Sequence, residues 1–94
     1  MIWKVTYHEA VTQDFDRLGR AEARRVLRVV EERIINGEPD KSGKALRGLL
    51  AGCRRIRTGD LRIVYRIKGT ELVLLLCVGP RRDDEVYDIV KSRV

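Results

Sequence analysis

The 94-residue sequence is short of the residue types that mark several classes of protein, with two cysteines, two prolines and one histidine. Cys53 and Cys77 match no metal-ligand spacing, and two cysteines make a poor disulfide framework, so reduced thiols are expected. No run approaches the roughly 20 apolar residues of a membrane span. Lys4, His8 and Glu9 interrupt any N-terminal signal peptide. These absences favour a cytoplasmic protein that needs no metal or other cofactor and does not contact the membrane.

Aromatic residues are scarce as well, with one Trp, three Tyr and one Phe. Trp3, Phe15 and Tyr65 fall in apolar patterns and are expected in the core. Tyr87 differs, because it lies about 100° away from Val86 and so at the edge of the apolar stripe of the last expected helix. Tyr87 is therefore a candidate site residue.

What is present predicts one small domain, residues 1–94, of the α+β class. The expected order is β-α-α-β-β-β-α, with two N-terminal helices packed on one face of a small, mainly antiparallel, twisted sheet and a short C-terminal helix. The strands are expected at Met1–Tyr7, Cys53–Thr58, Leu61–Ile67 and Leu72–Val78. The helices are expected at Glu9–Gly19, Arg20–Asn36 and Asp83–Arg93.

Local signals set these boundaries. Gly59-Asp60 and Lys68-Gly69-Thr70 are short turns that make antiparallel hairpins of the last three strands. Residues 37–52 read as a loop around a short apolar patch. The buried face of the second helix is expected to comprise Ala23, Val26, Leu27, Val30 and Ile34.

The positive charge is unevenly distributed. Residues 1–43 hold eight basic and eight acidic side chains, whereas residues 44–94 hold twelve basic and six acidic. The net charge of +6 therefore comes from the second half, and fifteen of the twenty basic residues are Arg, which suits bidentate phosphate binding. A polyanion-binding surface is indicated, and a solvated basic surface is the alternative.

Strand alternation places the arginines on one surface. If Ile56 and Ile63 pack under the helices, the arginines that alternate with them stand on the other face of the hairpin. Like charges on neighbouring strands repel, so this face is easier to explain if a phosphate chain binds there. A solvated outer face with Asp60 and Glu71 as counter-ions is the alternative. The arginines in question are Arg55, Arg57, Arg62 and Arg66.

Three segments of the sequence form a recognisable set: Leu46-Arg47-Gly48, then Arg55-Ile56-Arg57 with Gly59-Asp60-Leu61-Arg62-Ile63-Val64-Tyr65, then Val78-Gly79-Pro80-Arg81 through Glu85-Val86-Tyr87. On these residues, and over its whole length, the sequence resembles the RelE/ParE toxin superfamily, and in particular the RelE-type mRNA interferases. The hairpin motif is common across the superfamily. Arg81 followed by Tyr87 is the more specific signal for the ribonuclease branch.

The resemblance implies a ribosome-dependent endoribonuclease toxin held inactive by a cognate antitoxin, with the ribosome and mRNA as further partners. The implied reaction is metal-independent attack of a ribose 2′-hydroxyl on the adjacent phosphate. The implied catalytic residues are Arg55, Arg57, Arg62, Arg81 and Tyr87. Further RNA contacts are expected from Lys44, Arg47, Arg66 and Arg82.

By resemblance, Arg57 and Arg62 clamp the phosphate, Arg81 lies by the leaving 5′ oxygen, and Tyr87 orients or stacks on a nucleotide. Well-known members have lysine where this chain has Arg55. Because arginine stays protonated, Arg55 is a poor general base and is expected to stabilise charge. Tyr87 and His8 remain as candidate bases, although a lone histidine at a strand-to-helix boundary is more often a polar cap.

Two other functions stay open. A ParE-like gyrase poison would share the fold, but such chains generally lack the terminal tyrosine and the full arginine set. A degenerate relative that only binds RNA or an antitoxin is the third possibility, and the arginine at position 55 keeps it open.

Overall fold

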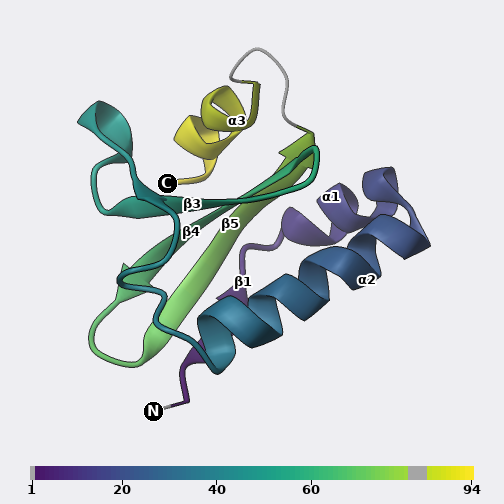
Figure 1. The fold of residues 1–94 in the computed structure, drawn as a ribbon. Helices are drawn as coiled ribbons and strands as arrows, with labels where there is room; N and C mark the ends of the chain where they lie inside the picture. The colour runs from purple at the N-terminus through teal and green to yellow at the C-terminus, as the bar shows by residue number, and fades with distance from the viewer. Residues whose placement is uncertain (1, 81–84) are drawn as a thin grey trace.

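The computed structural model describes residues 2–80 and 85–94, and its sheet lies between helices on both faces (Figure 1). The strand order is β1-β5-β4-β3-β2; β1 runs parallel to β5 and the other neighbours are antiparallel. The strands are β1 (Lys4–Tyr7), β2 (Lys44–Ala45), β3 (Cys53–Thr58), β4 (Leu61–Lys68) and β5 (Leu72–Pro80). The helices are α1 (Val11–Leu18), α2 (Arg20–Val29) and α3 (Glu85–Arg93). The expected α+β class and the mainly antiparallel sheet are confirmed.

The two N-terminal helices cover one face of the sheet, as expected. Their apolar residues pack with Ile56, Ile63 and Tyr65 in the larger of two core clusters. Leu27 was expected on the buried face of the second helix, and this prediction is wrong, because 45% of the residue is exposed. The buried residues of this segment are Val26, Val30 and Ile34, which follow one another at intervals of four. Leu27 is one position further round the helix than Val26 and therefore faces solvent.

The second helix is also less regular than expected. After Val29 it widens into a π-helical segment, η1 (Val30–Ile35), so the helix expected to reach Asn36 is α-helical only in its first part. The carbonyl of Ile35 accepts a hydrogen bond from the Trp3 amide at 2.9 Å, which ties this end of the helix to the chain just before β1.

The short C-terminal helix packs on the opposite face of the sheet, a position that the sequence did not indicate. Val86 and Val90 are buried there in a second cluster with Val64 of β4. A bulge in β5 supports this packing, since Leu76 and Cys77 are consecutive yet both belong to the second cluster. The sheet therefore has two buried faces, and each is covered by different helices.

The expected loop 37–52 contains two short elements. They are β2, which pairs with β3, and the 3₁₀ turn η2 (Gly48–Leu50). Both lie beside the arginine-bearing hairpin. Within residues 2–80 and 85–94, no helix has the length and hydropathy needed to span a bilayer.

Candidate active site

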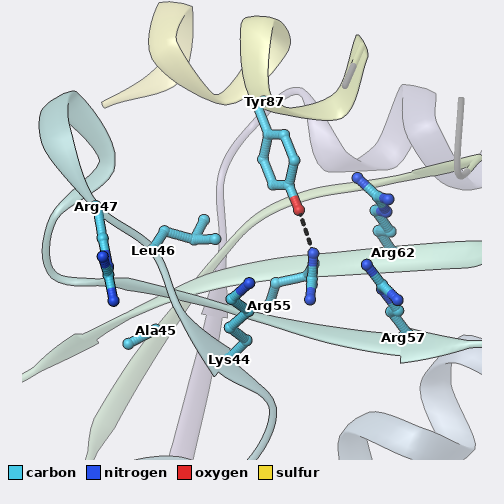
Figure 2. A pocket seen from close by; sticks show the side chains of 8 residues that line it. All are labelled: Lys44, Ala45, Leu46, Arg47, Arg55, Arg57, Arg62 and Tyr87. Atoms are coloured by element: carbon cyan, nitrogen blue, oxygen red, sulfur yellow. Dashed lines mark hydrogen bonds between the residues drawn. The ribbon is translucent and has the colours of Figure 1, made fainter. Parts of the chain in front are cut away.

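A hollow of about 520 Å³ lies over the β3–β4 hairpin, on the face that α3 covers in part (Figure 2). Strands β2, β3 and β4 contribute its floor and one wall, and α3 contributes the opposite side. We call this hollow the arginine pocket. The described residues that line it are Lys44, Ala45, Leu46, Arg47, Arg55, Arg57, Arg62 and Tyr87.

Strand register explains why three arginines meet there. Arg57 lies directly opposite Arg62 across the hairpin, and Arg55 is two residues before Arg57, on the same face of β3. Arg55 pairs with Val64, so its neighbour across the hairpin is apolar and not a fourth cation. Five of the described lining residues are cationic and none is acidic. Such a pocket suits an anion with several oxygens.

Tyr87 enters the pocket from α3, because burial of Val86 and Val90 fixes the side of the helix that faces the sheet. Its hydroxyl oxygen accepts a hydrogen bond of 2.6 Å from a terminal nitrogen of Arg55. A guanidinium group has no acceptor, so the hydroxyl proton of Tyr87 must point to something else. The Tyr87 hydroxyl can therefore still donate its own proton to another group in the pocket.

A second cation contacts the same ring. The guanidinium carbon of Arg62 lies 5.2 Å from the centroid of the Tyr87 ring, within cation–π range. Only 8% of Arg62 is exposed, so this cation acts where water screens little. The buried Nε of Arg55 has no hydrogen-bond partner among the described residues.

The structure brings together six of the nine site residues predicted from the sequence, namely Arg55, Arg57, Arg62, Tyr87, Lys44 and Arg47. Arg66 is exposed on the same face but pairs with Cys53, four residues or about 13 Å along β4 from Arg62, and does not line the pocket. Arg81 and Arg82 lie outside the described residues.

His8 is also outside the arginine pocket. It follows β1 at the far edge of the sheet, with β5 and β4 between it and β3. Its Nδ1 accepts a hydrogen bond of 3.1 Å from the Ala10 amide, just before α1 begins. The histidine thus acts as the local polar cap that its position suggested.

A buried ion pair that the sequence analysis missed anchors α3. Arg93 donates to both carboxylate oxygens of Asp14, at 2.6 and 3.0 Å, and to the carbonyl of Leu76 at 2.9 Å. Asp14 also accepts the Val78 amide at 3.1 Å. The pair therefore caps the edge of β5 beyond the end of β1 and joins α1 to the last turn of α3. The signal was available, since Asp14 stands three residues after Val11 in the apolar stripe of its helix.

A second missed residue supports the hairpin. Arg25 of α2 donates a hydrogen bond of 2.8 Å to the carbonyl of Thr58, next to the Gly59 turn. Gly59 has φ +56°, and a Cβ atom there would overlap the Arg25 guanidinium. Arg25 thus fixes the turn that joins Arg57 to Arg62.

Comparison with known proteins gives the family. A model described as the ParE toxin of the type II toxin-antitoxin system parDE matches residues 5–85. No curated protein matches the sequence at a significant level.

Solved structures show the same fold. A chain of the toxin-antitoxin complex RelBE2 from Mycobacterium tuberculosis is 28% identical, with a TM-score of 0.77 over 86% of this chain and 100% of that one. A double arginine-to-alanine mutant of the Escherichia coli toxin RelE, in its free state, is 23% identical, with a TM-score of 0.80 over 100% and 99%. A conserved hypothetical protein from Helicobacter pylori is 21% identical, with a TM-score of 0.58 over 85% and 94%. The chain belongs to the ParE toxin family of type II toxin-antitoxin systems, within the RelE/ParE superfamily.

Proposed function

We propose that this toxin is an endoribonuclease that cleaves mRNA on the ribosome. The observation that carries the proposal is the arginine pocket, in which Arg55, Arg57 and Arg62 form a cationic floor and Tyr87 presents a hydroxyl donor (Figure 2). Phosphate contacts alone would suit any nucleic acid. A tyrosine held by one arginine and stacked on another is an arrangement suited to reaction at a phosphate.

The chemistry divides among these residues. Attack of the ribose 2′ oxygen forms an O–P bond, breaks the bond from phosphorus to the 5′ oxygen, and leaves a 2′,3′-cyclic phosphate and a 5′-hydroxyl. Negative charge rises on the phosphorane oxygens, where the Arg57 and Arg62 guanidinium groups stabilise it. Arg55 holds Tyr87, whose hydroxyl donates toward the phosphate or the leaving oxygen.

One proton must also leave the 2′-hydroxyl. Arginine does not deprotonate in proteins, so Tyr87 and Lys44 are the described lining residues that can exchange a proton. His8 lies at the far edge of the sheet and is a poor candidate. We retain the proposal that Arg81 neutralises the leaving oxygen.

The proposed partners follow from the family and the charge. One relative was solved as a toxin-antitoxin complex. We propose that a cognate antitoxin binds this chain and that its acidic side chains complement the arginine pocket. The ribosome supplies the mRNA and holds it in an extended form that the pocket can reach.

The test is induction of the toxin in cells, followed by mapping of new 5′-hydroxyl ends on translated messages. Cleavage should fall about 100-fold or more in Arg57→Ala, because a fixed positive charge at the phosphate is lost. It should fall at least about tenfold in Tyr87→Phe, which keeps the ring and removes only the hydroxyl donor.

The matched control is Arg28→Ala, which removes an exposed arginine from α2, on the other side of the sheet from the pocket. It should leave cleavage within about twofold of wild type. The family model carries the name of ParE, so the gyrase-poison function is the second candidate. Growth arrest with intact messages and damaged DNA would favour that function, and no growth effect would favour a non-catalytic relative.

A further inference from the structure

A second hollow, of about 540 Å³, adjoins the arginine pocket between η2 and α3. We call it the leucine groove. It shares Leu46, Arg47 and Tyr87 with the arginine pocket, so the two hollows form one continuous surface. The described residues that line it are Leu46, Arg47, Gly48, Leu49, Leu50, Tyr87, Asp88 and Lys91.

The groove is lined by both apolar and charged side chains. Leu49 is 83% exposed, whereas its neighbour Leu50 is buried and packs in the second core cluster with Val86 and Val90. An exposed leucine held on a short turn beside a functional pocket is the kind of apolar patch that marks a binding surface. Arg47 and Lys91 add two positive charges to the lining.

The proposed function makes an RNA nucleotide the best fit for this groove. A phosphate in the arginine pocket is linked through its sugar to a base, and the wall shared by the two hollows leads directly from one to the other. Unpaired bases have an apolar face and a polar edge, which suits a lining that combines leucine and charged side chains. Arg47 and Lys91 suit the flanking backbone phosphates.

The groove also holds one carboxylate, that of Asp88, whose side chain is 77% exposed. This carboxylate faces Lys91 in an exposed ion pair of 3.8 Å, and within the described part of the chain no hydrogen bond occupies it. A carboxylate accepts hydrogen bonds and repels carbonyl oxygens. Adenine, cytosine and guanine carry an exocyclic amino group, whereas uracil offers a carboxylate only its ring N3–H, which lies between two carbonyl oxygens.

Building on the proposed endoribonuclease activity, we infer that the leucine groove binds the nucleobase next to the scissile phosphate and that Asp88 selects bases with an exocyclic amino group over uracil. Leu49 supplies affinity for the face of any base, and Asp88 supplies the choice among bases. The two residues should therefore have separable effects.

The experiment maps cleavage of a message library that is randomised around each cleavage site. Wild type should disfavour uracil at one flanking position by about fivefold or more, the scale of a hydrogen bond to a base edge. Asp88→Asn, which offers a donor as well as an acceptor, should bring that ratio close to one. Leu49→Ala should lower cleavage of all sequences and leave the ratio unchanged. Glu71→Gln, which removes an exposed negative charge at the β4–β5 turn, is the matched control and should change neither quantity.

A binding measurement separates this inference from the proposed function. Affinities for short 2′-O-methyl oligonucleotides with adenine, cytosine or uracil at the flanking position are measured with wild type and Asp88→Asn. Base-selective binding that needs Asp88 supports the inference even if wild type cleaves no message. An unchanged base ratio in Asp88→Asn overturns it. It is also overturned if Leu49→Ala keeps every RNA affinity but escapes neutralisation by a co-expressed cognate antitoxin, since the groove would then bind a protein.

Discussion

At the scale of single residues, Cys77 lies at the bulge of β5 and close to Asp14 of the buried ion pair. Burial, together with the nearby Asp14 carboxylate, raises the pKa of the Cys77 thiol from its ordinary value of 9.0 to about 12. The thiol is therefore protonated at neutral pH and is a poor nucleophile. In the folded protein it acts as a small apolar side chain.

This pKa predicts a loss of stability at alkaline pH. Because the folded state holds the Cys77 proton more tightly than the unfolded state, the contribution is fully present below about pH 9 and is lost as pH rises toward 12. We expect the free energy of unfolding in urea to fall over this range, and to fall less steeply in Cys77→Ala. Tyr65 and Cys53 have pKa values raised by burial and act in the same direction, so the informative quantity is the difference between the two proteins. Parallel curves would contradict the assignment.

The arginines of the candidate site could be predicted from single residues, because strand alternation fixes the face on which a side chain stands. That rule placed Arg55, Arg57 and Arg62 together correctly. It placed Arg66 on the same face but could not limit how far along the strand a pocket extends. The Asp14–Arg93 pair was missed because its partners are 79 residues apart and only the folded sheet brings them together.

At the scale of elements, α3 is held at two points, by the apolar contacts of Val86 and Val90 and by Arg93 in its last turn. Arg93→Met should destabilise the protein by about 3 kcal/mol, because it leaves the buried Asp14 carboxylate without its cation. The measurement is the midpoint of chemical unfolding. Lys91→Met, which removes an exposed cation from the same helix, should change stability by less than about 0.5 kcal/mol.

Helix α3 carries both Arg93 and Tyr87, so Arg93→Met should also affect the arginine pocket. Without Arg93 the helix is less firmly placed, so the hydroxyl of Tyr87 meets Arg55 less often and cleavage should fall. In a Tyr87→Phe background, Arg93→Met should add little further loss, because the hydroxyl that it positions is already absent. Additive losses in the double variant would mean that Arg93 acts by another route.

Elements with strong periodicity were predicted well, and their placement was predicted less well. Strand β3 has the expected bounds, and β4 is one residue longer than expected. The parallel pairing of β1 with β5 and the packing of α3 on the opposite face depend on contacts between distant segments, which local patterns do not encode. The π-helical segment η1 and the bulge in β5 change the spacing of residues along the backbone, and neither can be recognised in the apolar pattern of the sequence.

At the scale of the whole molecule, the net charge of +6 predicts salt-sensitive binding of RNA. Affinity for a non-cleavable 2′-O-methyl oligonucleotide should decrease linearly with the logarithm of salt concentration. Lys44→Ala should make that slope shallower by about 0.7, the value for one phosphate contact on a single strand. Lys68→Ala, on an exposed residue at the end of β4, is the control and should leave the slope unchanged.

The pairing of β1 with β5 also limits how early the protein can fold during its synthesis. Residues 4–7 find their strand partners only at residues 72–75, so the sheet cannot close while the early part of the chain is emerging from the ribosome. Tyr87 emerges later still, and Arg93 after it. A nascent or truncated polypeptide that stops short of Tyr87 would have no assembled arginine pocket, so the proposed cleavage could begin only after this tyrosine, and Arg93 behind it, had left the ribosome.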